Sequence, residues 1–377
     1  MRVVFLFLVS FFLLIPRGVF AQSPTQPTFS LGQVTQVYEE GQQDISGYQL
    51  EFQRLGVKLF ASQQEVEVLL NGSPALTENQ KFKPGEQVVV AAMSDENGEP
   101  IYSITDRYRL PTLGVILAIF FALVVLVGRK KGLQSFLGLG ITMAILFLYI
   151  LPLVLSGRAP TAAIFSGTVL IAIVSLYVSH GFTKRTTLAL VSTLATLVLV
   201  ALFSWWAVIA TRMLGVGSEE ALFVQFGVGQ GLDLRGLLTG GIIIGALGVL
   251  DDITTAQTAA VEELKKANKK LQFKELYGHA ISIGREHIAS LVNTLVLAYA
   301  GASLPLLLLL IGDQVQPLWV ILNSEYLAEE IVRTLVGSSA LVLAVPISTA
   351  VAAYVYANGI TIPGERWFQQ EDEHHHH

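Results

Sequence analysis

Cysteine is absent from this chain of 377 residues, which excludes disulfide bonds, thiolate metal sites and cysteine nucleophiles. Charge is scarce as well: 14% of residues are charged, 52% are hydrophobic, and the mean hydropathy is +0.58. This composition is typical of an integral membrane protein, whose solvent is the lipid bilayer. The net charge of −5 is small and the basic residues gather in short loops, so no nucleic-acid partner is expected.

The two ends of the chain carry processing signals. Residues 1–21 combine an early arginine, a short apolar run and small residues at Val19 and Ala21, which predicts a secretory signal peptide cleaved after Ala21. An uncleaved anchor helix is the alternative, although the apolar run is short for a bilayer and Pro16 follows it. At the other end, residues 374–377 are histidines typical of an expression tag.

Residues 22–109 predict a small all-β domain. Short segments of alternating apolar and polar residues are separated by turn signals such as Pro84-Gly85 and Asn97-Gly98. About five such strands suggest an OB-like barrel, which the signal peptide would place outside the cytoplasm. Its aromatic side chains are expected in the core rather than on a ligand platform; they are Tyr38, Tyr48, Phe52 and Phe60.

Seven apolar spans of about 20 residues follow, which is the length that a bilayer requires. They predict a transmembrane helix bundle over residues 110–358, ahead of a cytoplasmic tail over residues 359–373. The fold class is therefore a mainly α polytopic membrane protein with an extracytoplasmic β domain. A glycine-rich stretch, Leu222–Leu232, is too short to cross and is expected to be re-entrant or interfacial. The spans are 111–128, 133–155, 160–179, 187–211, 236–262, 288–311 and 331–355.

Basic residues set the predicted orientation. Three basic groups fall at alternate ends of the spans: Arg129–Lys131, Lys184–Arg185 and the lysines of residues 265–274. The positive-inside rule then places the C-terminus in the cytoplasm and the β domain outside.

The fifth span contains an acidic pair, Asp251 and Asp252, which the apolar run of residues 236–250 places at membrane depth. An ionised side chain near the bilayer centre costs roughly 2.5–3.5 kcal/mol, so an acidic pair there indicates function. The metal, if any, is not identified, but these two carboxylates are the best candidate ligands. Asp251 shares one helix face with further oxygen groups that suit a hard cation or a proton, namely Thr255, Thr258 and Glu262.

The same span begins with glycines that allow close helix approach, namely Gly240, Gly241, Gly245 and Gly248. Glycines ahead of an intramembrane acidic pair also permit the local unwinding that transporters use at ion sites. Both interpretations place this helix in the interior of the bundle.

A second polar stripe leads into the sixth span. We expect this stripe to face the fifth helix, with Arg285 neutralising an aspartate and Glu286 or His279 relaying ions or protons. Deeper in the span, Asn293 is expected to form an interhelical hydrogen bond. The alternative is an amphipathic connector whose charges lie in water. The stripe repeats at three- or four-residue steps and comprises His279, Ser282, Glu286, Ser290 and Asn293.

The stretches GALGVLDDITTAQTAAVEEL, IGREHI, NTLVLAYAG and AVPISTAVAA resemble the YibE/F-like family of bacterial membrane proteins. The resemblance extends over the mature chain and is most specific at the glycine-rich helix with the acidic pair. Within this pattern Asp251 is the better candidate, because the second acidic position varies in the family. The resemblance implies the family's fold and a bacterial source, but no substrate and no reaction. The expected location is the inner membrane of a bacterium.

An enzymatic function is not expected. An intramembrane aspartyl protease needs aspartates from two different helices, and prenyl transfer needs a spaced DDxxD-type motif, whereas this pair lies within DDITT. The sequence also has no P-loop, and no cofactor is expected.

Two function classes remain. The preferred hypothesis is an ion- or proton-coupled secondary transporter or channel for a small solute or cation, with the acidic pair as its ion site. The alternative is a non-transporting scaffold or sensor whose outer β domain binds a partner or ligand. Polar stripes that continue past the acidic pair favour transport, because a scaffold needs no path across the bilayer. Small residues on exposed spans also permit a homo-oligomer.

Overall fold

A computed structural model of the chain describes residues 27–45, 48–71, 81–94, 98–227, 231–312 and 316–361. The predicted signal peptide, the histidine tag and nearly all of the predicted tail lie outside these residues. The chain forms two compact units that divide between Val127 and Gly128. The first contains an antiparallel sheet, and the second is helical.

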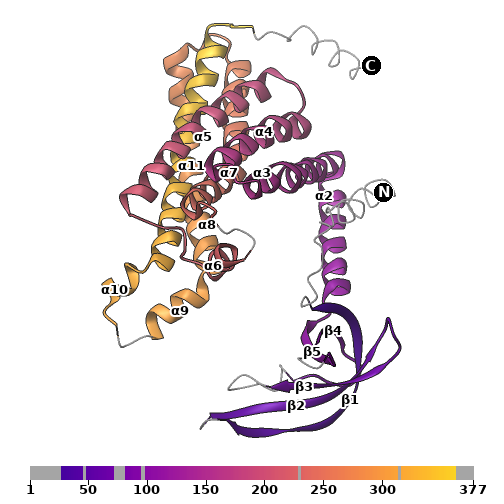
Figure 1. The fold of residues 1–377 in the computed structure, drawn as a ribbon. Coiled ribbons are helices and arrows are strands. Elements are labelled where there is room, and N and C mark those ends of the chain that lie inside the picture. Colours follow the sequence, from indigo (N-terminus) through magenta and orange to yellow (C-terminus); the bar gives the residue numbers. More distant parts are fainter. Residues whose placement is uncertain are drawn as a thin grey trace. The chain divides into compact units, whose positions relative to one another are not determined.

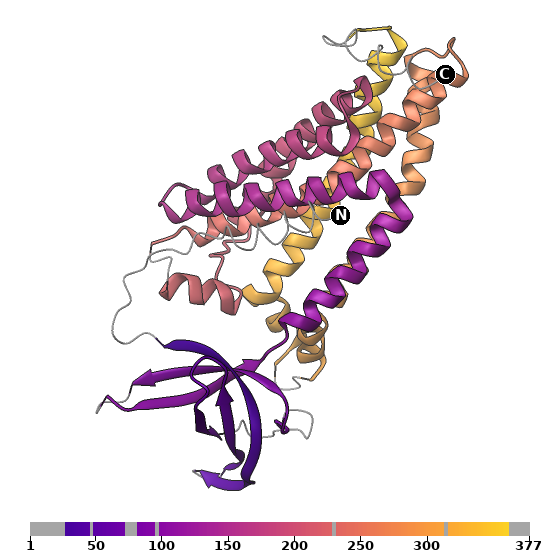
Figure 2. The ribbon, with the colours of Figure 1, turned by 90° about the vertical axis from the view of Figure 1, so that its right-hand side faces the viewer.

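Five antiparallel strands build the sheet in the order β3-β2-β1-β4-β5, and the sheet curls into a half-barrel (Figure 2). β1 belongs to both halves, because one part of it pairs with β2 and the other with β4. Gly32 lies where the two pairings meet, and a Cβ there would lie 2.7 Å from Cγ1 of Val57. The strands are β1 (Thr28–Ile45), β2 (Tyr48–Leu59), β3 (Glu65–Asn71), β4 (Gln87–Ser94) and β5 (Pro100–Arg107).

The alternating segments of the sequence form these strands, because every second side chain points into the curl. Gln53 is buried there and is satisfied by the backbone of Phe82, whose N–H donates to Gln53 Oε1 at 2.9 Å. The expectation of a core position is wrong for Tyr38 and Phe60, which are 49% and 41% exposed. The core comprises Val34, Leu55, Val57, Leu59, Val66, Val68, Phe82, Val88 and Val90.

Side-chain caps mark where several helices begin. Thr183 accepts from the backbone N–H of Thr186, and Asp233 accepts from that of Gly236 at 3.0 Å. The helices are α2 (Leu110–Ile145), α3 (Leu151–Leu155), α4 (Pro160–His180), α5 (Lys184–Ala210), α6 (Glu219–Phe226), α7 (Leu234–Ala267), α8 (Phe273–Ala302), α9 (Leu304–Gly312), α10 (Leu318–Leu322) and α11 (Glu325–Ala357), with a π-helical turn at Leu146–Ile150.

Among the described residues, five helices are long and apolar enough to cross a membrane: Leu110–Leu155, Pro160–His180, Lys184–Ala210, Leu234–Ala267 and Glu325–Ala357. The first contains two predicted spans, 111–128 and 133–155, and Arg129 between them leaves the helical conformation with φ of 50°. The predicted span 288–311 is divided between α8 and α9 and is not among the five. The helices are those of a membrane protein, while the number of seven spans stays a prediction.

α7 is the central helix of the second unit. It packs against α4, α5, α8 and α11, and Figure 1 shows it among these four. Its inward face joins the main apolar cluster through residues such as Ile242, Ile243 and Leu250, each 1% exposed or less. The helix with the acidic pair therefore lies in the interior of the bundle, as the sequence predicted. The short segment Leu222–Leu232 forms the end of α6 over its first residues, and residues 228–230 lie outside the described part.

Candidate functional site

The acidic pair on α7 is split between two environments. Asp251 is partly buried, and its Oδ1 is enclosed without a hydrogen-bond partner among the described residues. Asp252 is exposed and makes no hydrogen bond or ion pair within that part of the chain. Adjacent helical residues point about 100° apart, which explains why one carboxylate faces the bundle and the other faces away.

Hydroxyl groups extend from Asp251 along the inner side of α7. Thr255 donates to the backbone carbonyl of Asp251, and Thr258 donates to that of Thr254 at 2.6 Å. Thr254 donates to the carbonyl of Leu250 at 2.9 Å, and its Oγ1 lies 2.7 Å from that of Thr193 on α5. Each of these hydroxyl groups donates its one hydrogen to a carbonyl of its own helix. The hydroxyl oxygens can therefore only accept further hydrogen bonds. The surroundings of Asp251 are therefore rich in acceptors, which suits a proton or a hard cation.

Gln257 joins three helices one and a half turns beyond the acidic pair. Its Nε2 donates to the carbonyl of Ala280 on α8 and to Oγ1 of Thr349 on α11, each at 2.7 Å. The side chain is 5% exposed. At this level Gly284 of α8 lies so close to α11 that a Cβ would overlap the side chain of Val345. Gln257 is thus the polar connection that holds α8 against the central helix.

Glu262 lies at the charged end of the same helix face. Its carboxylate is 3.1 Å from Nζ of Lys266 and 3.9 Å from Nη1 of Arg185 on α5. The predicted stripe of Asp251, Thr255, Thr258 and Glu262 does share one side of α7, but its last member is occupied by basic partners. Among the described residues, no group of three or more potential metal-ligating side chains was found.

The expectation that the polar stripe of α8 faces α7 is wrong. The buried side of α8 consists of Leu276, Ala280 and Gly284. A helix has 3.6 residues per turn, so residues that are not in register with this apolar side point away from it. Arg285 forms no ion pair with either aspartate in the described part of the chain. The exposed residues are His279, Ser282, Arg285, Glu286, Ser290 and Asn293.

The glycines of α7 divide into two groups. A Cβ on Gly240 would overlap the side chain of Ile164 on α4 and lie 2.9 Å from its Cβ, so Gly240 permits the contact between α4 and α7. A Cβ on Gly241, Gly245 or Gly248 would meet no atom within 4 Å. The packing predicted for these three is not found within the described residues, where they lie on an open face of α7.

Replacing Gly240 by alanine is expected to destabilise the protein by about 1–3 kcal/mol, because the methyl group overpacks the contact with α4. Gly241→Ala is the matched control on the same helix and is expected to be neutral or to stabilise by up to about 1 kcal/mol. Thermal unfolding in detergent measures the difference. Equal melting temperatures for the two variants would contradict the close contact between α4 and α7.

A second acidic cluster was not predicted. α11 begins at Glu325, six residues before the predicted span at 331, and Glu325 Oε1 accepts from the backbone N–H groups of residues 214–216. Glu329, only 5% exposed, accepts from the N–H of Gly217 at 2.9 Å. These bonds attach the loop between α5 and α6 to the start of α11. The sequence pattern that could have predicted this cluster is a pair of acidic residues four positions apart, directly before an apolar run.

Comparison with known proteins gave one positive result. Residues 116–358, more than half of the chain, match the sequence model described as YibE/F-like protein. The match covers the apolar helices and the acidic pair, and it begins after the sheet, so it is narrower than the resemblance expected over the mature chain. Comparison with curated proteins and with solved structures found no match.

Proposed function

The chain belongs to the YibE/F-like family, and we propose that its helical unit is an ion- or proton-coupled secondary transporter or channel for a small solute or ion. The observation that carries this proposal is Oδ1 of Asp251 on the central helix, which is enclosed and has no hydrogen-bond partner among the described residues. A buried carboxylate oxygen that accepts no hydrogen bond raises the free energy of the folded state. A bound proton or cation removes this penalty. An exchangeable ligand at Asp251 is the simplest reason to keep this group in a membrane helix.

The neighbouring residues supply the rest of the proposed site. Asp251 binds the coupling ion, and Thr255, with its hydroxyl oxygen close to the Asp251 carbonyl, assists. Asp252, on the exposed side of α7, is proposed to guide the ion toward its neighbour. Arg285, Glu286 and Asn293 are not included, because they lie on the exposed side of α8. The proposed activity is binding and movement of a ligand, not an enzymatic reaction.

We propose the inner membrane of a bacterium as the location, with the sheet unit outside and the C-terminus in the cytoplasm. The alternating basic loops support this orientation. An OB-like identity for the sheet unit is supported by the strand order and by the contact between its edge strands β3 and β5. Seven spans and a homo-oligomer are further parts of the proposal.

The test is the thermal stability of the detergent-purified protein across sodium, potassium, manganese, zinc and a pH series. A ligand that binds only the folded state stabilises it by about 2.7 kcal/mol at one hundred times its Kd. We expect one ion, or protons, to stabilise the wild type, and we expect this shift to vanish in Asp251→Asn and to persist in Asp252→Asn. A wild type that responds to no ion and no pH would remove the main support for the proposal.

A second candidate function is a sensor or scaffold that binds a ligand on the sheet unit. The observation in its favour is a cavity of about 650 Å³ beside the exposed Tyr38, lined also by Lys81, Lys83, Glu39 and Glu40. Cavities of roughly 300–1,000 Å³ are typical of small-molecule sites. This function predicts a ligand response that is lost on changing Tyr38 and retained in Asp251→Asn.

A further inference from the structure

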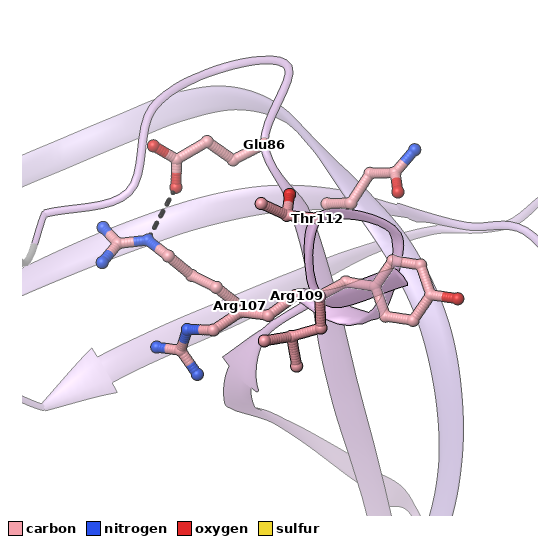
Figure 3. Close-up of a pocket in the computed structure, with 7 residues that line it drawn as sticks. Glu86, Arg107, Arg109 and Thr112 are labelled. Carbon is pink, nitrogen blue, oxygen red and sulfur yellow. Dashed lines mark hydrogen bonds and ion pairs between the residues drawn. The ribbon is translucent and has the colours of Figure 1, made fainter. Parts of the chain in front are cut away.

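A second cavity lies where β5 runs into α2, inside the first unit. Its volume is about 330 Å³. Figure 3 shows the guanidinium groups of Arg107 and Arg109 on the same side of it, with the carboxylate of Glu86 joined to Arg107. The lining residues are Glu86, Gln87, Arg107, Tyr108, Arg109, Thr112 and Leu113.

Along the chain, this cavity lies at the start of the first apolar stretch that is long enough to cross a membrane. α2 begins at Leu110 and is the start of an apolar stretch whose most hydrophobic window has none of its residues buried inside the protein. Leu110 and Leu113 are 66% and 54% exposed, so the first turn of this stretch offers apolar side chains to lipid. Tyr108 and Arg109 directly precede it, and tyrosine and arginine are the side chains that anchor a span at the headgroup level.

The two arginines of the cavity differ in how firmly they are held. Arg107 donates from Nε to Glu86 at 3.1 Å and from Nη2 to the carbonyl of Lys81 at 2.8 Å, and its guanidinium stacks on Phe82. These contacts fix its direction and leave its positive charge beside the cavity. Arg109, in contrast, is exposed, and its one ion pair among the described residues is with the exposed Asp106, at 2.7 Å.

The Arg109–Asp106 pair is one that a ligand can replace. The hydrogen bond from Arg109, helped by the backbone N–H of Arg107, lowers the pKa of Asp106, so the pair is fully ionised near neutral pH. Ion pairs of this exposure contribute little to folding, and a phosphate is a better bidentate partner for a guanidinium than a solvated carboxylate. Releasing Asp106 to water therefore costs little.

Two hydroxyl groups that can donate hydrogen bonds also line the cavity, those of Tyr108 and Thr112. In the part of the chain that the structure describes, neither the hydroxyl of Tyr108 nor that of Thr112 has a partner. Two cations and one anion line the cavity, so its lining carries a net positive charge once Arg109 is released from Asp106. Donors and positive charge beside an apolar helix match a phosphate that is attached to acyl chains.

We propose that this cavity binds the phosphate of an anionic phospholipid headgroup, with Arg109 and Thr112 donating hydrogen bonds and the acyl chains lying along α2. Arg107 is a positioning residue that contributes charge, and Leu113 forms the apolar edge through which the chains leave. The site would attach the sheet unit to the membrane surface at a defined point. It is independent of the transport proposed for the helical unit.

The experiment uses the full-length protein in nanodiscs that contain a trace of photoactivatable phosphatidylglycerol, and mass spectrometry maps the crosslinks. Labelling is expected on residues 108–117 of the wild type. It is expected to fall about fivefold in Arg109→Gln, because one arginine near the membrane surface contributes about 1 kcal/mol to the binding of anionic lipid. Arg54→Gln is the matched control, because Arg54 is an exposed arginine of the same unit that pairs with Glu39 and Glu67. Its labelling is expected to equal that of the wild type.

Two further experiments test whether the ligand needs both the phosphate and the acyl chains. Photoactivatable diacylglycerol, which has the acyl chains without the phosphate, is expected to label this segment weakly. Inorganic phosphate at the lipid's concentration is expected not to compete. Undiminished labelling in Arg109→Gln, or equal labelling by diacylglycerol, overturns the proposal. Displacement by inorganic phosphate would show a free-phosphate site and overturn the assignment to lipid.

Discussion

Asp251→Asn is expected to abolish ion- or proton-coupled flux through the protein, a loss of at least about 100-fold that corresponds to roughly 3 kcal/mol of lost ion binding. Asparagine has nearly the size of aspartate, so the packing of α7 is kept, but it has no negative charge to bind a proton or cation. The acceptor-rich threonines around it cannot replace that charge. Flux is measured in proteoliposomes by the response of an interior pH dye or ion indicator to an imposed gradient.

Two control variants test whether the loss of flux is specific to Asp251. Asp252→Asn changes the same charge one residue away, on the exposed side of the helix, and is expected to retain a substantial part of the flux. Glu263→Gln removes an exposed carboxylate that pairs with Lys266 near the end of α7 and is expected to behave as the wild type. If Asp251→Asn transports as well as Glu263→Gln does, Asp251 is not the coupling site.

Gln257→Leu is expected to destabilise the helical unit by about 2–3 kcal/mol. Leucine fills a similar volume but supplies no donor, so the carbonyl of Ala280 and the hydroxyl of Thr349 lose the N–H groups they share with Gln257. These partners lie in the bundle interior, where water does not replace the lost bonds. Thermal or denaturant unfolding in detergent measures the change.

Thr349→Val provides the matched comparison, since it removes one of the two bonds to Gln257 and keeps the shape of the side chain. Its expected cost is about 1 kcal/mol. Because the two residues share a bond, the double variant should be less destabilised than the sum of the single variants. Strict additivity, or a Gln257→Leu protein that melts with the wild type, would contradict the three-helix connection.

The two changes also separate function from folding. Asp251→Asn should melt near the wild type and fail in flux, whereas Gln257→Leu should lose stability first. This contrast follows from their partners, because Oδ1 of Asp251 has none in the described chain and the amide of Gln257 has two.

Local sequence patterns were sufficient to predict the strands and the long apolar helices, and they identified Asp251 as a candidate ion-binding residue. Alternation within residues 22–109 predicted a small sheet, because side chains of a strand point to opposite faces and one face is buried. Long apolar runs predicted the membrane helices, because a bilayer leaves no other partner for backbone polar groups. Asp251 stood out for the same reason, since a carboxylate in such a run must be compensated by something.

What the sequence determined by itself was thus the class of protein, the presence of a sheet ahead of apolar helices, and the helix that carries the acidic pair. Only the tertiary structure decided which helix faces meet: the polar side of α8 turns away from α7, Gly240 packs while Gly241 does not, and Glu325 joins α11 to a loop over 100 positions away. A helix period shows which residues share a face but not which neighbour that face contacts. That choice depends on the packing of all the helices at once, which no local pattern contains.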